Sequence, residues 1–294
     1  MSNNISTFVK LILNQNYMTK GIFSSFNENS KLFEILKKEP PIWWKNIKSD
    51  KDLNIELRKD NYINIYYYGG CVAKIWYDNK LHAETHHKYL NLPQKGETIY
   101  LDSIDYLSSD KKINDIKSAI SDIFLNDNIE GDQKRKDKKL TESCEKKVQG
   151  RLILDSKVNY IDSEFAYNRS KQRIRFDLIK VEDGSISFVE LKLISDSRLT
   201  SKKDNEIEII TQMNKYSEFI QDYKEDIIPY YKKLLNVKQS LGIIDDIPEI
   251  KELNFKPQLL IINNYLGKGI KVRDNRIDRI KKIISNQKFD FEIR

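Results

Sequence analysis

Residues 173–193, RIRFDLIKVEDGSISFVELKL, predict a β-hairpin. The first half, residues 173–181, is rich in Ile, Phe and Leu, and the second half, Ser185–Leu193, is nearly all apolar. Between them, Asp183 and Gly184 can supply the positive φ angles that a tight hairpin turn requires. The stretch is therefore expected to form two neighbouring strands of a buried sheet.

Asp177, Glu190 and Lys192 are charged residues inside these apolar strands. A charge is costly to bury unless it is paired or holds a metal ion. Side chains alternate between the two faces of a strand, so Glu190 and Lys192 point the same way, and the hairpin can place Asp177 beside them. Two carboxylates and an ammonium on one face could bind a divalent metal and act on an attacking water.

The composition limits the class of protein. The 294 residues are 39% apolar and 32% charged, which is enough for two domains with a polar surface. The net charge of +7 favours a polyanionic partner, although a lysine-rich composition alone gives the same value. Cys71 and Cys144 cannot build a disulfide framework or a zinc site, so a reducing cytoplasm is expected. No run approaches the roughly 18 apolar residues of a spanning helix, so no membrane association is expected.

The first half of the chain predicts an α+β domain over residues 1–127. Ser30 can cap a helix that stops before Pro40, and a second helix is predicted over residues 104–125. Between these helices, short apolar and aromatic runs separated by turn residues predict an antiparallel four-strand meander. Its strands are predicted at residues 53–58, 62–68, 71–77 and 81–86.

One face of this meander would be rich in aromatic side chains interleaved with cations. Such a face could stack on unpaired bases. We expect instead that the flanking helices cover it, because strands favour aromatic residues whatever their function. The residues on this face are Arg58, Tyr62, Tyr66, Tyr68, Lys74, Trp76, His82 and His86.

Residues 128–139 are polar and end in a basic run, which predicts a linker and places a second domain at residues 140–294. A basic run in a linker is usually solvated, but it could also contact phosphates. The same holds for the outer face of a helix predicted over residues 275–285. The candidate nucleic-acid-binding residues are Lys134, Arg135, Lys136, Arg276, Arg279 and Lys282.

The second domain predicts the order helix, three strands, helix, strand. The first helix begins near Thr141 and carries Glu145, and the strand at residues 158–167 carries Glu164. After the hairpin, an amphipathic helix is predicted over residues 205–223, and Pro229 is expected to separate it from a further helix. Residues 257–263 form a continuous apolar run, typical of a buried strand, and an edge strand is predicted at 289–293.

These elements and motifs resemble the PD-(D/E)XK nuclease superfamily, which has a restriction-endonuclease-like mixed-sheet core (αβββαβ). The triplet Glu190-Leu191-Lys192 matches the (D/E)XK part, and Asp177 matches the acid of the preceding strand, although Phe176 replaces the proline. Two other Glu-x-Lys triplets and several Asp-x-Lys triplets occur, but only Glu190–Lys192 lies in an apolar strand. Gln212 and Tyr216, four residues apart on one helix face, resemble the QxxxY motif of RecB-type members.

The resemblance implies roles for individual residues. Asp177 and Glu190 would ligate Mg²⁺, for which Mn²⁺ can substitute, together with the carbonyl of Leu191. Lys192 would orient or deprotonate the attacking water and offset charge on the phosphate. Gln212 would hold a phosphate or the water of the metal, with Tyr216 packed behind it. Glu164 and Glu145 are the further candidates for metal binding, and Glu164 also for catalysis.

The function implied is an Mg²⁺-dependent deoxyribonuclease, an endonuclease of the kind found in phage defence or mobile elements. The first 127 residues would target it, bind DNA, or form a homodimer or a complex with a partner protein. Two alternatives remain open. The chain could be a catalytically inactive nucleic-acid-binding module, or a protein-interaction module in which the charged strand residues form a buried ion pair.

Overall fold

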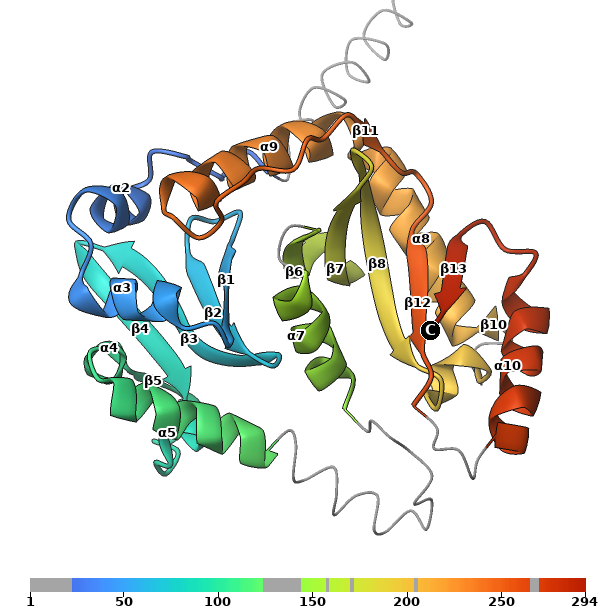
Figure 1. The fold of residues 1–294 in the computed structure, drawn as a ribbon, viewed down its shortest axis with the longest axis horizontal. Coiled ribbons are helices and arrows are strands. Elements are labelled where there is room, and N and C mark those ends of the chain that lie inside the picture. Colours follow the sequence, from blue (N-terminus) through green and yellow to red (C-terminus); the bar gives the residue numbers. More distant parts are fainter. Residues whose placement is uncertain (1–22, 124–143, 157–158, 170–171, 204–205, 265–269) are drawn as a thin grey trace, which may run out of the picture.

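The computed structural model describes residues 23–123, 144–156, 159–169, 172–203, 206–264 and 270–294. It has a mixed α/β architecture with two main sheets, one antiparallel and one mixed (Figure 1). The predicted linker, residues 128–139, and its candidate residues Lys134, Arg135 and Lys136 lie outside the described residues. Within the described ranges, no helix has the length and apolar character needed to cross a bilayer.

The first sheet is an antiparallel meander with strands in sequence order, as predicted, but with a fifth strand at its end. The fifth strand was not predicted because it has only three residues and pairs on one side alone. The strands are β1 (Leu53–Leu57), β2 (Ile63–Tyr67), β3 (Gly70–Asp78), β4 (Lys80–His86) and β5 (Tyr100–Asp102).

The helices around this sheet pack on its apolar side. Trp44, Ile47 and Ile120 lie in one core cluster with Ile63 and Ile75 of the sheet. The helix predicted over residues 104–125 is two helices, because the first ends at Leu107 with Ser108 as its C-cap, and Ser109 caps the second by accepting the N–H of Lys112. The helical elements are α2 (Lys31–Lys38), α3 (Ile42–Ser49), η1 (His87–Leu90), α4 (Ile104–Leu107) and α5 (Asp110–Ser121).

The aromatic face of the meander is not covered by these helices, contrary to our expectation. Tyr62, Trp76 and His82 are half-buried, and the side chain of Lys74 is 41% exposed. By contrast, the residues of the opposite face, such as Ile65 and Ile75, are inaccessible to solvent. The flanking helices supply apolar side chains, and these pack where burial is most favourable, on the aliphatic face.

The second sheet has the strand order β13-β12-β8-β7-β6, with β11 also paired to β8. The hairpin is confirmed, because β7 and β8 pair antiparallel and both Asp183 and Gly184 have positive φ angles, 52° and 83°. β12 runs parallel to β8, and β13 parallel to β12. The strands are β6 (Tyr160–Arg169), β7 (Gln172–Glu182), β8 (Ser185–Leu193), β11 (Glu252–Leu253), β12 (Gln258–Ile262) and β13 (Asp290–Ile293).

Helices flank this sheet, and Figure 1 shows α7 and α8 on different sides of β7 and β8. The predicted break at Pro229 is wrong, since the chain breaks at Tyr223 and the next helix runs through the proline. Pro229 lies in the second turn, where its missing N–H removes a single helical hydrogen bond. The helices are α7 (Glu145–Asp155), α8 (Glu208–Asp222), α9 (Lys224–Ser240) and α10 (Ile270–Ile284), with a short η3 (Ser197–Leu199) and a two-strand ribbon, β9 (Lys202–Lys203) and β10 (Glu206–Ile207).

A buried ionic network joins the two sheets. Arg58, at the end of β1, donates to Asp162 of β6 over 2.8 Å. Lys238 of α9 donates to Glu56 of β1 over 2.7 Å and to the carbonyl oxygen of Ile161. Burial raises the pKa of Asp162 to about 7, and the charge of Glu56 adds to this increase. The network therefore depends on both cations.

Replacing Lys238 by methionine should lower the free energy of unfolding by about 3–5 kcal/mol, the usual cost of removing one partner of a buried ion pair. The reason is that Glu56, which is 1% exposed, would keep its charge beside Asp162. Urea unfolding measures the change. Lys251→Met, which breaks a pair with exposed Glu249, is the control and should leave the urea midpoint nearly unchanged. Equal stabilities for the two variants would contradict the role of the network.

Candidate active site

The charged residues of the hairpin lie where its two strands separate. The antiparallel ladder between β7 and β8 ends at the pair Leu178–Val189, one residue before Asp177 and Glu190. Beyond this pair the carboxylate of Asp177 accepts the backbone N–H of Leu191 over 2.9 Å. The side chain thus takes the place of a strand partner, and this contact fixes its orientation toward β8.

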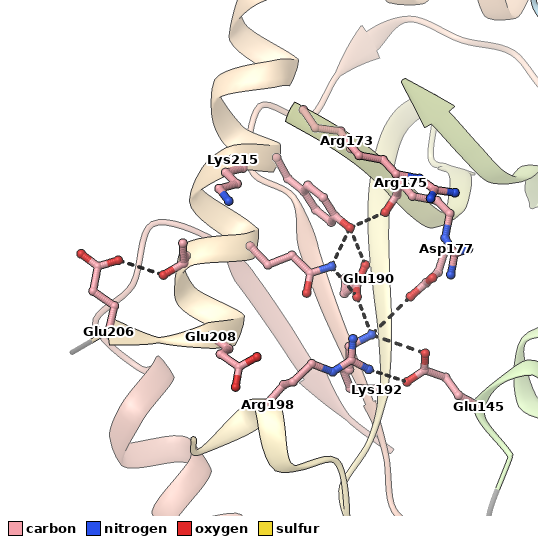
Figure 2. Close-up of a pocket in the computed structure, with 14 residues that line it drawn as sticks. Glu145, Arg173, Arg175, Asp177, Glu190, Lys192, Arg198, Glu206, Glu208 and Lys215 are labelled. Carbon is pink, nitrogen blue, oxygen red and sulfur yellow. Dashed lines mark hydrogen bonds and ion pairs between the residues drawn. The ribbon is translucent and has the colours of Figure 1, made fainter. Parts of the chain in front are cut away.

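The ammonium of Lys192 is the centre of the cluster (Figure 2). Its Nζ forms an ion pair with Glu190, lies 3.6 Å from Asp177 Oδ2 and 3.5 Å from Glu145 Oε1, and donates to the carbonyl oxygen of Leu191 over 2.6 Å. The side chain is 1% exposed. One cation therefore contacts oxygens of all three carboxylates and of the intervening carbonyl, as the sequence predicted for Asp177 and Glu190.

Glu190 is held by the two residues of the QxxxY motif. Gln212 Nε2 donates to Glu190 Oε1 over 2.7 Å, and the hydroxyl of Tyr216 lies 2.8 Å from Glu190 Oε2. This hydroxyl also contacts the carbonyl oxygen of Arg175, so its single proton must be shared between two acceptors. Both residues lie on α8, one helical turn apart, and both act on the carboxylate of Glu190.

The cluster holds three carboxylates around one ammonium, and the pKa values reflect this excess. Burial raises the pKa of Asp177 to about 7, with a further increase from the charge of Glu190. Burial also raises the pKa of Glu145. For Lys192, burial alone would lower the pKa, but the charges of Glu190, Asp177 and Glu145 outweigh it and keep the pKa above its usual value.

These donors fit a divalent cation of the Mg²⁺ type. Hard cations prefer carboxylate and carbonyl oxygens, and the oxygens of Asp177, Glu190 and Leu191 already converge on a single positive charge. Within the described residues, no three His, Cys, Asp or Glu side chains form a group that could hold a metal by themselves. A metal here would need the Leu191 carbonyl and water as further ligands, and the ammonium of Lys192 would have to shift.

A cavity of about 650 Å³ opens above the cluster. Its rim carries Arg173 and Arg175 of β7 and Lys215 of α8, all exposed, opposite the loop that carries Arg198. The exposed cations of this rim suit a ligand with a phosphate backbone, whose reacting phosphate would lie near Lys192 and the carboxylates of the floor. The remaining lining residues are Ile174, Glu206, Glu208 and Thr211.

Arg198 is a cavity residue that the sequence reasoning missed. It pairs with Asp196 through several hydrogen bonds, and its Nη2 lies 3.9 Å from Glu145. The pairing with Asp196 raises the pKa of Arg198. Its only sequence signal was an acid two residues earlier in a short loop, and such a signal does not reveal that the loop folds back over β8.

Glu164 does not line this cavity, although the register of β6 places it opposite Asp177. Its φ angle is 53°, and its carboxylate forms ion pairs with Arg175 at 3.3 Å and Lys146 at 3.8 Å. The left-handed backbone at this position redirects the side chain. The candidate role of Glu164 as a metal ligand therefore gains no support, whereas Glu145 is placed at the cluster.

The candidate binding residues of α10 differ among themselves. Arg276 is half-buried and donates to the carbonyl oxygens of Ile194 and Asp196, so it braces the loop after β8. Arg279 and Lys282 are exposed. The predicted phosphate contact of Arg276 is thus replaced by a structural one, because unsatisfied carbonyls at the end of β8 require donors.

No family model, curated protein or solved structure matches this chain.

Removing the hydroxyl of Tyr216 tests how Glu190 is held. If the cluster supports the metal-dependent nucleic-acid cleavage that the sequence predicts, Tyr216→Phe should lower the cleavage rate by about 10–100-fold, as for other residues that orient a metal ligand. Its effect on stability should be about 1 kcal/mol, the net value of one hydrogen bond. Cleavage rates and melting curves measure both. Tyr167→Phe is the control, because its hydroxyl bonds Tyr223 outside the cavity, and it should cleave normally.

Proposed function

We propose that the protein is a metal-dependent nuclease of the PD-(D/E)XK superfamily, with a restriction-endonuclease-like core, that hydrolyses DNA with Mg²⁺ or Mn²⁺. One observation carries the proposal: Asp177, Glu190, Lys192 and the Leu191 carbonyl converge at the floor of an open, cation-rimmed cavity. The chain order α7, β6, β7, β8, α8, β12 agrees with the order of this core, with η3, β9 and β10 inserted before α8 and with α9 and β11 inserted before β12.

Asp177, Glu190 and the carbonyl of Leu191 would hold the metal. When bound, such a metal supplies positive charge to the phosphate and lowers the pKa of a water. The backbone N–H of Leu191 orients Asp177, while Gln212 and Tyr216 orient Glu190.

Lys192 has two uses in this reaction. Its Nζ can donate a hydrogen bond that orients the attacking water, and its charge can offset the negative charge that builds on the phosphate oxygens in the transition state. The exposed Arg173, Arg175 and Lys215 on the rim can bind the flanking phosphates, because none of them is buried in the cluster itself.

A second function is favoured by one feature of the same cluster. Lys192 is 1% exposed and already contacts three carboxylates, which is also the arrangement of a structural ion pair. In that case the chain would bind nucleic acid or a partner protein without cleaving anything. Metal dependence separates the two functions, since an ion pair needs no metal.

The test uses purified full-length protein with closed circular plasmid, linear duplex and single-stranded DNA, each with Mg²⁺, Mn²⁺ or EDTA. We expect cleavage with either metal and none with EDTA, and nicking of the closed plasmid would establish endonuclease action. A protein that cleaves none of these substrates, and none of the corresponding RNAs, with either metal would overturn the proposal.

A further inference from the structure

Three hollows of the molecule are neighbours, because each shares lining residues with the next. The catalytic cavity shares Arg173 and Arg175 with a second hollow of about 240 Å³ that lies between the two sheets. The second hollow shares Asp60 and Tyr62 with a third, of about 480 Å³, on the meander. The residues that line two hollows at once show that the three are neighbours, although they are built from distant parts of the sequence.

The third hollow lies on the aromatic face of the meander. The ammonium of Lys74 is 5.3 Å from the ring centroid of Tyr62 and 5.1 Å from that of Trp76. On the neighbouring strand, His82 stacks on Trp76 with an interplanar angle of 10°. Neither Tyr62 nor Trp76 belongs to the hydrophobic core, so their rings are not needed to fill it.

The cations along this route can be released to a ligand. Lys74 pairs with Glu84 at 3.1 Å and Arg175 pairs with Glu164 at 3.3 Å, but both side chains are more than 40% exposed. The Lys74–Glu84 pair is partly exposed on both sides, and pairs of this kind contribute little, so a phosphate can replace Glu84 at small cost. Glu164 is only 11% exposed, but it also pairs with Lys146, which would still compensate its charge if Arg175 moved to a phosphate. Movement of Lys74 toward a phosphate would also uncover the ring faces of Tyr62 and Trp76. Arg173 forms no ion pair with any residue in the described ranges.

We propose that these hollows bind one unpaired polynucleotide strand, which runs from the catalytic cavity past Arg173 and Arg175 to the rings of Tyr62 and Trp76. The inference rests on the proposed nuclease function for the cavity and adds the form of its substrate, a single strand or a duplex with a single-stranded tail. Aromatic rings stack on bases only when the bases are unpaired, and a cationic groove with such rings is the usual single-strand site.

The buried network between the sheets makes this route rigid. Arg58 and Asp162, together with Lys238 and Glu56, hold the meander against β6, beside the middle hollow that Arg58 also lines. Because the two sheets are already held together, only side chains such as Lys74 need to move when the strand binds, so more of the interaction energy contributes to affinity.

The first experiment measures binding by fluorescence anisotropy of labelled single strands of about 4 and about 16 nucleotides, lengths that bracket common single-strand sites. Binding is measured under two conditions in which no cleavage is expected: the wild-type protein in EDTA, and the Asp177→Asn variant in Mg²⁺. We expect the long strand to bind more tightly than the short one. Tyr62→Leu and Trp76→Leu should each weaken binding of the long strand about tenfold or more, while leaving the short strand unaffected.

Tryptophan fluorescence gives an independent readout. Of the three tryptophans, Trp43 and Trp44 are buried and Trp76 is half-exposed. A base stacked on Trp76 should therefore quench the emission when the long strand is added, and Trp76→Leu should abolish this quenching. The matched control is Tyr100→Leu, which removes another ring of the meander that is exposed, lies outside the hydrophobic core and lines none of the three hollows.

The outcomes separate this inference from the proposed function. Unchanged affinity for the long strand in both variants, or a loss confined to duplex DNA, would overturn the single-strand route even if the wild type cleaves DNA. Length-dependent binding that is lost in the variants would support the route even if no substrate is cleaved. Parallel DNA and RNA strands show which sugar the route accepts.

Discussion

Asp177→Asn should lower DNA cleavage by at least about a thousandfold, because a metal at this position would contribute several kcal/mol to the transition state. The substitution removes one carboxylate ligand but retains an oxygen that can accept the N–H of Leu191. The loss should therefore come from the chemistry and not from misfolding. Time courses of plasmid cleavage with Mg²⁺ measure it.

The same variant should be more stable than the wild type at pH 8 without metal. Burial raises the pKa of Asp177 from 3.8 to about 7 in the folded protein, so the folded state binds the proton more tightly than the unfolded chain. The free energy of unfolding must then fall as the pH rises through this window, and asparagine removes that fall. Melting curves in EDTA at pH 5 and pH 8 compare the two proteins.

The control for both measurements is Asp183→Asn in the turn of the same hairpin. Asp183 is exposed and has a positive φ angle, which asparagine also tolerates. This variant should retain wild-type cleavage and wild-type pH dependence. Normal cleavage by Asp177→Asn would contradict the assignment of the active site. An unchanged pH profile of its stability would contradict the buried charge.

The hairpin and the convergence of Asp177, Glu190 and Lys192 were predictable from sequence because their causes are local. The turn needs positive φ angles at Asp183 and Gly184, and the two-residue period of a strand fixes which side chains share a face. The four-residue spacing of Gln212 and Tyr216 likewise places both on one side of α8. The periodicity of a strand or helix does not determine how elements lie relative to one another, and the predictions that depended on such distances failed.

Glu164, Arg198 and Arg276 illustrate this limit. Glu164 has the expected register opposite Asp177, but a single positive φ angle at that residue redirects its carboxylate to Arg175 and Lys146. Arg198 and Arg276 take their positions from the path of the loop after β8. Loop paths depend on tertiary contacts that no local pattern records.

The buried ionic network between the two sheets was also not predictable from the sequence. Glu56 lies within a predicted strand and Lys238 within a helix, 182 residues apart, and each is unremarkable alone. The expectation that helices cover the aromatic face of the meander was wrong because packing between distant elements is likewise not visible in a local pattern. Its pattern shows which side chains share a face, but the side on which the helices pack follows from competition between the two faces for burial.

Lys192→Met tests whether the central ammonium serves the reaction, the fold, or both. With Mg²⁺ present, cleavage should fall by at least about two orders of magnitude, the usual loss when a positioned proton donor or charge-stabilising group is removed. Methionine has a similar length and no charge, so it fills the space that Lys192 occupies at 1% exposure. Loss of packing is therefore not expected to explain the change in rate.

Without metal, Lys192→Met should be destabilised by about 3–5 kcal/mol, since Asp177, Glu190 and Glu145 would lose the cation that they share. Mg²⁺ should restore much of this loss, because a ligand that binds only the folded state stabilises it in proportion to the logarithm of its concentration. Lys180→Met is the matched control. The ammonium of Lys180 pairs with Glu182, which is 63% exposed. The free energy of unfolding of the Lys180→Met variant should therefore change by less than about 1 kcal/mol.

The combination of the two readouts decides between the functions. For a nuclease, we expect a Lys192→Met protein that is inactive, that is unstable in EDTA and that regains stability with Mg²⁺. In such a protein the bound metal would neutralise Asp177 and Glu190 in place of the ammonium. A variant that Mg²⁺ does not stabilise, from a wild type that cleaves no substrate, would assign the cluster to the fold as a buried ion pair. Wild-type cleavage by Lys192→Met would remove the lysine from the mechanism while leaving the carboxylates in it.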